Sequence, residues 1–266
     1  MREDIDKLVK AISARQSNRH YLPELLESNH RDEMNRFIKS LDPPFDTDVE
    51  LNYHEVPNDD KIVYFKGPPQ FISLSTSESI LDKAKAGFLG ELVILYAESL
   101  GVKTCWMGHF KKKEVYQIVH NSSEEESSKK IFCIITLGYI PDKTGLLDRF
   151  SKWRMSKKNR SVSSFLHEDS MEEFPENIRF ALDLAGKAPS AMNSQKWYYH
   201  ISTQDEKYTI EISKPNNYQH FKWKHYNMDV GAAAAHCWLG LSVRGLEPIV
   251  SLSTRENDVI WKFMCK

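Results

Sequence analysis

A basic segment follows the first apolar stretch of the chain. Residues 15–21 read Arg-Gln-Ser-Asn-Arg-His-Tyr, so Arg15 and Arg19 flank Ser17 at alternate positions. On an extended backbone, alternate side chains point to the same side. Guanidinium groups offer planar, paired donors that suit phosphate oxygens. The segment therefore predicts a phosphate cradle, although so short a pattern, taken alone, is more typical of a solvated basic turn.

A second polar segment lies between a predicted helix and a predicted strand. Residues 188–197 read Ala-Pro-Ser-Ala-Met-Asn-Ser-Gln-Lys-Trp. Pro189 ends the helix, and the short polar residues that follow can offer side-chain and backbone groups to a planar polar ligand. The same residue types also suit an ordinary turn in which Ser190 and Asn193 satisfy their own backbone. On residue types alone, the two interpretations are equally favoured.

Motifs for other common ligands are missing from the sequence. It contains no GxG for a Rossmann nicotinamide site, no P-loop and no HExxH zinc motif. Residues 218–226 mix aromatic and basic side chains, as single-strand nucleic-acid surfaces do, and a second basic run occupies 152–160. A formal net charge of −1 argues against a nucleic-acid partner. For residues 218–226 we favour an aromatic flap over a substrate cavity.

Considered together, the two polar segments resemble the FMN-contacting segments of FMN-dependent nitroreductases. The resemblance rests on two motifs. One is RxSxR at residues 15–19, with an aromatic residue after it, and the other is PSxxNSQ at residues 189–195, followed within two residues by Trp. Residues 97–110 (AESLGVKTCWMGHF) resemble that family's turn after the central helix, which brings backbone groups to the flavin ring. Residues 131–140 resemble its closing strand, and Lys158-Asn159-Arg160 resembles its second phosphate-binding cluster. The resemblance spans residues 13–247.

The resemblance implies one FMN site composed from both halves of the chain. A full nitroreductase subunit carries PSxxN soon after RxSxR, whereas here each motif occurs once, in a different half. This pattern resembles the branch of the family in which one chain imitates the usual homodimer. Lys196 also replaces the proline that usually follows the glutamine. The implied cofactor contacts are Arg15, Ser17, Arg19, Met107, Gly108, Lys158, Arg160, Pro189, Ser190, Ala191, Met192, Asn193 and Gln195.

The implied activity is electron transfer from NAD(P)H through FMN to a nitroaromatic, a quinone or a similar acceptor. Because the chemistry belongs to the flavin, we expect no catalytic side chain and no metal. The alternative is a non-enzymatic protein that binds a ligand or nucleic acid on a degenerate nitroreductase scaffold. We expect a monomer or weak homodimer, with neither nucleic acid nor membrane as a partner.

Composition and cysteine usage place the chain among globular, cytoplasmic proteins. Hydrophobic residues make up 41% and charged residues 27% of its 266 residues. The four cysteines are scattered, with no CxxC pair, and suit a reducing compartment. The N-terminus lacks the features of a signal peptide. The longest apolar stretches are shorter than the roughly 20 residues that span a bilayer.

Hydrophobic periodicity predicts a mixture of helices and strands without regular βαβ alternation. We expect helices at 4–14, after Pro23, and at 85–100, 112–119, 175–184 and 230–243, and strands at 61–65, 71–74, 131–140, 198–202, 208–213, 249–252 and 259–263. This order favours an α+β fold with an antiparallel or mixed sheet.

One internal repeat divides the chain into two unequal nitroreductase-like halves. Residues 87–101 and 231–245 are both apolar helices bounded by glycines at the same separation. We expect the two helices to approach each other closely and to end at their C-terminal glycines. A polar, irregular stretch between them sets the predicted halves at 1–170 and 171–266.

Overall fold

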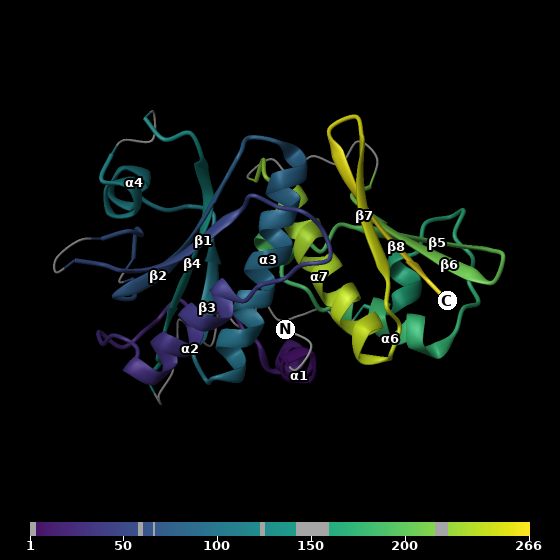
Figure 1. Ribbon diagram of the computed structural model, residues 1–266, viewed down its shortest axis with the longest axis horizontal. Helices are drawn as coiled ribbons and strands as arrows, with labels where there is room; N and C mark the ends of the chain where they lie inside the picture. The colour runs from purple at the N-terminus through teal and green to yellow at the C-terminus, as the bar shows by residue number, and fades with distance from the viewer. Residues whose placement is uncertain (1–3, 58–60, 66, 123–125, 142–159, 216–222) are drawn as a thin grey trace.

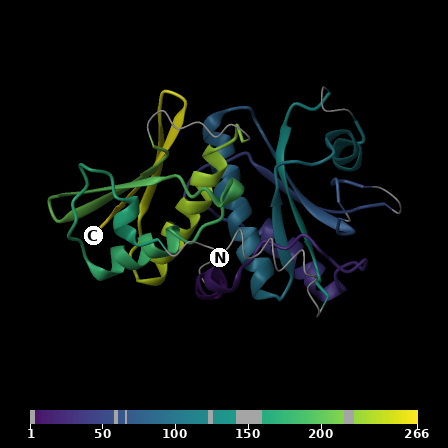
Figure 2. The same cartoon turned by 180° about the vertical axis from the view of Figure 1, so that it is seen from behind.

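The computed structural model describes residues 4–57, 61–65, 67–122, 126–141, 160–215 and 223–266. Within them, two antiparallel sheets of four strands stand on either side of a pair of long helices (Figures 1 and 2). The predicted α+β class is confirmed, and each half of the chain supplies its own sheet. No helix of the described ranges is both long and apolar enough to cross a membrane.

The first half contributes the elements up to residue 138. Its helices are α1 (Ile5–Ala14), α2 (Ser28–Lys39), α3 (Ile80–Ser99) and α4 (Lys112–His120). Its strands are β1 (Glu50–Glu55), β2 (Gln70–Thr76), β3 (Lys103–Met107) and β4 (Lys130–Gly138). In the sheet, their order is β1-β2-β4-β3, with every neighbouring pair antiparallel.

The second half repeats this topology. Its helical elements are the short turn η3 (Ala191–Asn193) and helices α6 (Glu176–Ala185) and α7 (Asn227–Val243), and the short turn η2 (Val162–Phe165) precedes the predicted boundary. Its strands are β5 (Tyr198–Gln204), β6 (Lys207–Ser213), β7 (Ile249–Arg255) and β8 (Asp258–Cys265). The order β5-β6-β8-β7 matches that of the first sheet, and in both halves a long helix follows the second strand.

The two long helices, α3 and α7, lie side by side between the sheets (Figure 1). Both are apolar around most of their circumference, as helices buried on all sides must be. A Cβ on Gly87 would stand 2.1 Å from the Met228 carbonyl oxygen, and one on Gly231 would stand 2.0 Å from that of Ala84. Ala84 and Met228 each precede the glycine of their own helix by one turn. The contact is therefore reciprocal, as across a two-fold axis.

The predicted repeat is thus confirmed as a packing relationship. Leu95 of α3 and Leu239 of α7 are both fully buried. Gly101 and Gly245 each have φ +78°, the left-handed conformation that commonly terminates a helix. The boundary between the halves at residue 170 stays a prediction.

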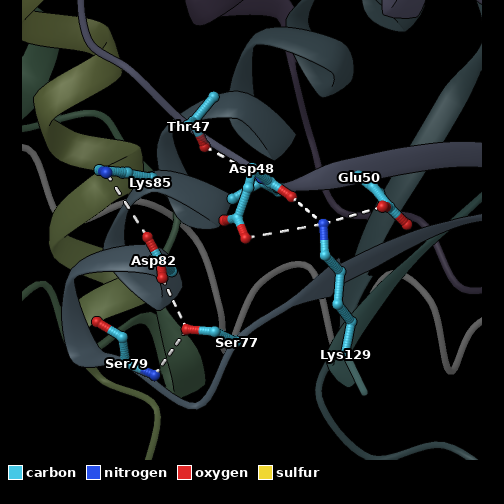
Figure 3. Close-up of polar contacts among 9 residues, drawn as sticks. Thr47, Asp48, Glu50, Ser77, Ser79, Asp82, Lys85 and Lys129 are labelled. Atoms are coloured by element: carbon cyan, nitrogen blue, oxygen red, sulfur yellow. Dashed lines mark hydrogen bonds and ion pairs between the residues drawn. The ribbon is translucent and has the colours of Figure 1, made fainter. Parts of the chain in front are cut away.

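Polar side chains fix the beginning of α3 (Figure 3). Ser79 Oγ accepts a hydrogen bond from the Leu81 amide at 3.2 Å, which satisfies a donor of the first helical turn. Ser77 Oγ accepts from the Ser79 amide at 3.0 Å and donates to the Asp82 carboxylate at 2.7 Å. Lys85 Nζ lies 3.6 Å from the same carboxylate. These contacts set where the helix starts and so hold its register against α7.

The structure differs from the sequence prediction at residues 61–65, at β1 and at β3, which lies within residues 97–110 where a turn was expected. Residues 61–65 form bends rather than a strand, because Ile62 and Val63 are buried in a small separate apolar cluster beside α4. β1 was not predicted, since its residues are mostly polar and only half-buried at the edge of the sheet. Glu50 of β1 forms an ion pair with Lys129, whose Nζ lies 2.9 Å from Glu50 Oε1 (Figure 3).

Candidate functional site

A cavity of about 130 Å³ opens between the two halves, beside the first turn of α7. Its wall combines the basic segment after α1, the end of β3, the residues of η3 and the start of α7. The lining residues are Ser17, Arg19, Cys105, Trp106, Gly108, Cys133, Pro189, Ser190, Ala191, Met192, Trp223, Met228, Asp229 and Ala232. Neither half alone could form it.

The basic segment reaches the cavity because it extends the first sheet beyond β3. Ser17 forms a parallel bridge with Thr104, and the Asn18 amide donates to the Thr104 carbonyl at 2.9 Å. The backbone is therefore extended here, and alternate side chains share a side. Ser17 and Arg19 both face the cavity. Arg15, the third residue of the predicted phosphate cradle, does not line the cavity.

Arg15 takes part in a buried charge network. It is only 5% exposed, and its Nε lies 3.7 Å from Glu91 Oε1, in the middle of α3. Glu91 also accepts from Trp106 Nε1 at 2.9 Å and contacts His236 Nε2 of α7 at 2.9 Å. Burial by itself would raise the pKa of Glu91, but the His236 hydrogen bond and the Arg15 guanidinium outweigh it and hold that pKa below its usual value.

The same network connects both central helices to the cavity wall. His236 Nδ1 lies 3.0 Å from the Leu184 carbonyl oxygen, which can only accept, so this nitrogen carries a proton. Nε2, the other ring nitrogen, faces the Glu91 carboxylate. The network thus joins α1, α3 and α7 at a buried point, and its Trp106 is part of the cavity wall.

The opposite wall is a loop with a strained backbone. Met192, Asn193 and Gln195 have φ values of 55°, 52° and 45°, which non-glycine residues seldom adopt. The Gln195 side chain, 2% exposed, donates to the Gly186 carbonyl at 2.8 Å, and the backbone amide of Gln195 donates to Ser190 Oγ at 2.8 Å. Gln195 therefore holds the loop from inside, while Pro189 through Met192 face the cavity. Strain of this kind is often found at binding sites.

Asp229 was not singled out by the sequence analysis. It lies in the first turn of α7, lines the cavity and accepts a hydrogen bond from the Ala191 amide at 3.2 Å. Removal from water raises its pKa to about 8, although the Ala191 amide and the Trp223 indole work in the opposite direction. The sequence signal that could have revealed it is a lone acid at the start of a wholly apolar helix.

The other predicted contacts are distributed unevenly around the cavity. Gly108 forms part of the wall, and a Cβ added to it would stand 2.3 Å from the Trp223 ring, which packs directly on this glycine. Met107 is buried at the end of β3 and does not line the cavity. Lys158 lies outside the described residues, as do 218–222 of the predicted flap, whereas Trp223 belongs to the cavity wall.

Arg160 supports the strained loop from behind. Its guanidinium donates to the Gln195 carbonyl at 2.9 Å and to the Ser164 carbonyl at 3.1 Å, and it lies 4.1 Å from the centre of the Phe165 ring. Neither Arg160 nor Asn193 is part of the cavity wall. The structure therefore brings together seven of the predicted contacts: Ser17, Arg19, Gly108, Pro189, Ser190, Ala191 and Met192.

Comparison with known proteins places this site in a family. Residues 7–241 match the sequence model of a family described as "Putative TM nitroreductase". The chain belongs to this nitroreductase family. The family is one of oxidoreductases, and the match includes both walls of the cavity.

One solved structure shows the same fold over nearly the whole chain. A "putative nitroreductase" from Thermotoga maritima aligns with a TM-score of 0.62 and 21% identity, covering 96% of this chain and 92% of that one. Among smaller structures, an FMN-dependent nitroreductase from Clostridium difficile R20291 aligns with a TM-score of 0.40 and 16% identity, covering 52% of this chain and 92% of that one. A nitroreductase with bound FMN from Bacteroides fragilis gives 0.39 and 15%, with 52% and 91% covered. No protein of curated function matches the sequence.

Proposed function

We propose that this chain is an FMN-dependent oxidoreductase that passes electrons from NAD(P)H to a nitroaromatic, a quinone or a similar acceptor. The proposal is supported above all by one observation. The two segments whose sequences resemble FMN-contacting motifs, far apart in the chain, face each other across a single cavity. In a member of a nitroreductase family, this is the natural position for the cofactor.

The donor set of the cavity fits FMN. Arg19 and Ser17 supply a guanidinium and a hydroxyl for the phosphate. Ser190 and the backbone around Ala191 supply neutral polar groups, and Gly108 lets a flat ring approach the backbone, as the Trp223 ring already does. Cofactor pockets usually measure roughly 300–1,000 Å³, more than the 130 Å³ observed. Cofactor binding against Gly108 therefore requires the Trp223 side chain to move.

Each residue then has a defined part in binding. Arg19 and Ser17 hold the phosphate, helped by Lys158. Gln195 and Arg160 keep the loop of Pro189 through Met192 in its strained form, so that its wall is preorganised. When bound, FMN accepts a hydride from NAD(P)H and passes electrons on. The chain contributes position, exclusion of water and the electrostatic environment.

One chain supplies both walls, so we propose that it works as a pseudo-dimer with a single site and needs no second subunit for binding. The reciprocal contacts of α3 and α7 support this reading, because they repeat within one chain the relationship that two subunits of a homodimer would have.

The decisive experiment uses the purified full chain. Incubation with FMN should give a protein that retains flavin absorbance after gel filtration. That protein should oxidise NADH or NADPH when a quinone or nitroaromatic is present. A colourless protein that ignores added FMN, yet shifts labelled single-stranded nucleic acid, would instead establish the non-enzymatic alternative.

A further inference from the structure

Among the described residues, the cavity wall contains one carboxyl group, that of Asp229, whose chemistry the proposed function leaves unused. One carboxyl oxygen, Oδ2, already accepts from the Ala191 amide. The Trp223 indole also acts on this carboxyl. Once that side chain moves to admit the cofactor, a protonated carboxyl can keep the Ala191 contact and present a hydroxyl from its other oxygen. The position is fixed from both sides, because Asp229 belongs to the rigid start of α7 and Ala191 to the opposite wall.

The surroundings keep this carboxyl protonated near neutral pH. Burial raises its pKa to about 8, so the acid form predominates at pH 7. In the part of the chain that the structure describes, the other titratable groups that face the cavity are Arg19 and the thiols of Cys105 and Cys133, and burial raises the pKa of both thiols. His225, in the turn before α7, has its pKa lowered to about 4, chiefly by burial, and stays neutral. None of these neighbours takes the proton from Asp229 at pH 7.

We propose that Asp229 is the proton donor to the electron acceptor reduced in this cavity, an inference that rests on the proposed function. Two-electron reduction of a quinone adds one hydride and one proton. The hydride originates in NAD(P)H. The proton passes from the Asp229 carboxyl to the acceptor oxygen, forming an O–H bond and leaving a carboxylate, which takes a proton from solvent before the next turnover. A proton donor whose pKa lies near the working pH is the efficient choice for this step.

The test compares Asp229→Asn with the wild type, using two acceptors. Asparagine keeps an oxygen that can accept from the Ala191 amide but has no proton of the required acidity. Ferricyanide takes single electrons and no proton, whereas a benzoquinone needs both. We expect the ratio of quinone turnover to ferricyanide turnover to fall about 100-fold in Asp229→Asn at pH 7. In the wild type the same ratio should fall as pH rises above about 8. Asp205→Asn, in the exposed turn between β5 and β6, is the matched control and should leave the ratio unchanged.

A second readout needs no turnover. Infrared difference spectra of the cofactor-free wild type, titrated from pH 6 to pH 10, should lose a protonated-carboxyl band that Asp229→Asn never shows. A quinone-to-ferricyanide ratio that is equal in the wild type and the variant would overturn the donor role, as would the absence of the band. If the wild type reduces neither acceptor, the proposed function itself fails, and the donor role fails with it.

Discussion

At the scale of single residues, the two arginines of RxSxR have separate tasks. Arg19 faces the cavity, whereas Arg15 is buried against Glu91. A charge-assisted hydrogen bond contributes about 1.5–3 kcal/mol, so Arg19→Ala should weaken FMN binding by roughly 10- to 150-fold. Riboflavin lacks the phosphate, so the affinity for riboflavin should hardly change. Flavin fluorescence titrations with both ligands measure the difference.

The control for this prediction is Arg179→Ala, which removes a half-exposed guanidinium near the start of α6 that does not line the cavity. It should leave the affinities for FMN and riboflavin unchanged. Equal losses for both flavins in Arg19→Ala would mean that Arg19 supports the fold and does not bind the phosphate.

Glu91 should contribute to stability rather than to binding. Replacing it by glutamine leaves the buried Arg15 and His236 without their negative partner, and breaking a buried pair in this way lowers the free energy of unfolding by about 3–5 kcal/mol. Because the pKa of Glu91 is lowered on folding, its contribution is fully present above its unfolded pKa of about 4.3. That contribution disappears as pH falls through the lower pKa of the folded state.

Urea unfolding of the wild type and Glu91→Gln at pH 7, and thermal unfolding of both in acid, measure this effect. The difference between the two proteins should shrink below pH of about 4. Glu176→Gln, at an 82% exposed side chain, is the control and should change stability by less than about 0.5 kcal/mol. A difference that grows in acid would contradict the assignment.

Sequence reasoning located the segments of the site better than it located their individual roles. The spacing of Arg15, Ser17 and Arg19 correctly indicates an extended segment, but it cannot show that a carboxylate 76 positions later, Glu91, draws Arg15 into the core. Asp229 was missed for a similar reason. Its position in the cavity wall depends on how α7 meets the loop at Ala191, which no local pattern records.

At the scale of elements, the crossing of α3 and α7 depends on two glycines. Alanine at Gly87 or Gly231 would place a methyl group about 2 Å from a backbone carbonyl, which cannot turn aside as a side chain can. We expect each substitution to lower the free energy of unfolding by about 3 kcal/mol or more, the upper end of the effects of overpacking. Chemical denaturation of the single variants measures it.

Gly186→Ala provides the comparison. Gly186 has an ordinary helical φ of −63°. Its added Cβ would come closest to the Phe165 ring, at 3.2 Å, and would stay at ordinary contact distance, 3.4 Å, from the nearest backbone oxygen. Its effect should stay within about 1 kcal/mol. If Gly87→Ala and Gly231→Ala lowered the free energy of unfolding as little as Gly186→Ala does, the close crossing of the central helices would be wrong.

Elements with strong apolar periodicity were predictable, and elements set by their neighbours were not. The spans 85–100 and 230–243 match α3 and α7 because an all-apolar helix has few alternatives to burial. β1 carries little such signal, since an edge strand needs only one apolar face. Residues 61–65 carry a misleading apolar pattern, because Ile62 and Val63 are buried without joining a sheet.

At the scale of the whole molecule, we expect one flavin site per chain. The phosphate cradle and the PSxxN loop each occur once, so the position related to the cavity by the approximate two-fold axis has neither set of donors. Calorimetric titration should saturate at one FMN per chain. Asn193→Ala, which changes a left-handed residue of the loop, should weaken the same site as Arg19→Ala.

Sedimentation measurements on the FMN-loaded protein show whether binding requires association. Saturation at two flavins per chain would overturn the single composite site. So would binding that occurs only when two chains associate.

The mutual burial of α3 and α7 also has a consequence during protein synthesis. The α3 helix is complete at Ser99, but its apolar partner is finished only at Val243. At roughly 5–20 residues per second, the ribosome leaves this surface uncovered for on the order of ten seconds. A nascent chain in that interval exposes the apolar side of α3 that α7 later covers. We therefore expect chains stalled between these points to be bound by chaperones or to aggregate, and the first half to reach its native form only after the second has emerged.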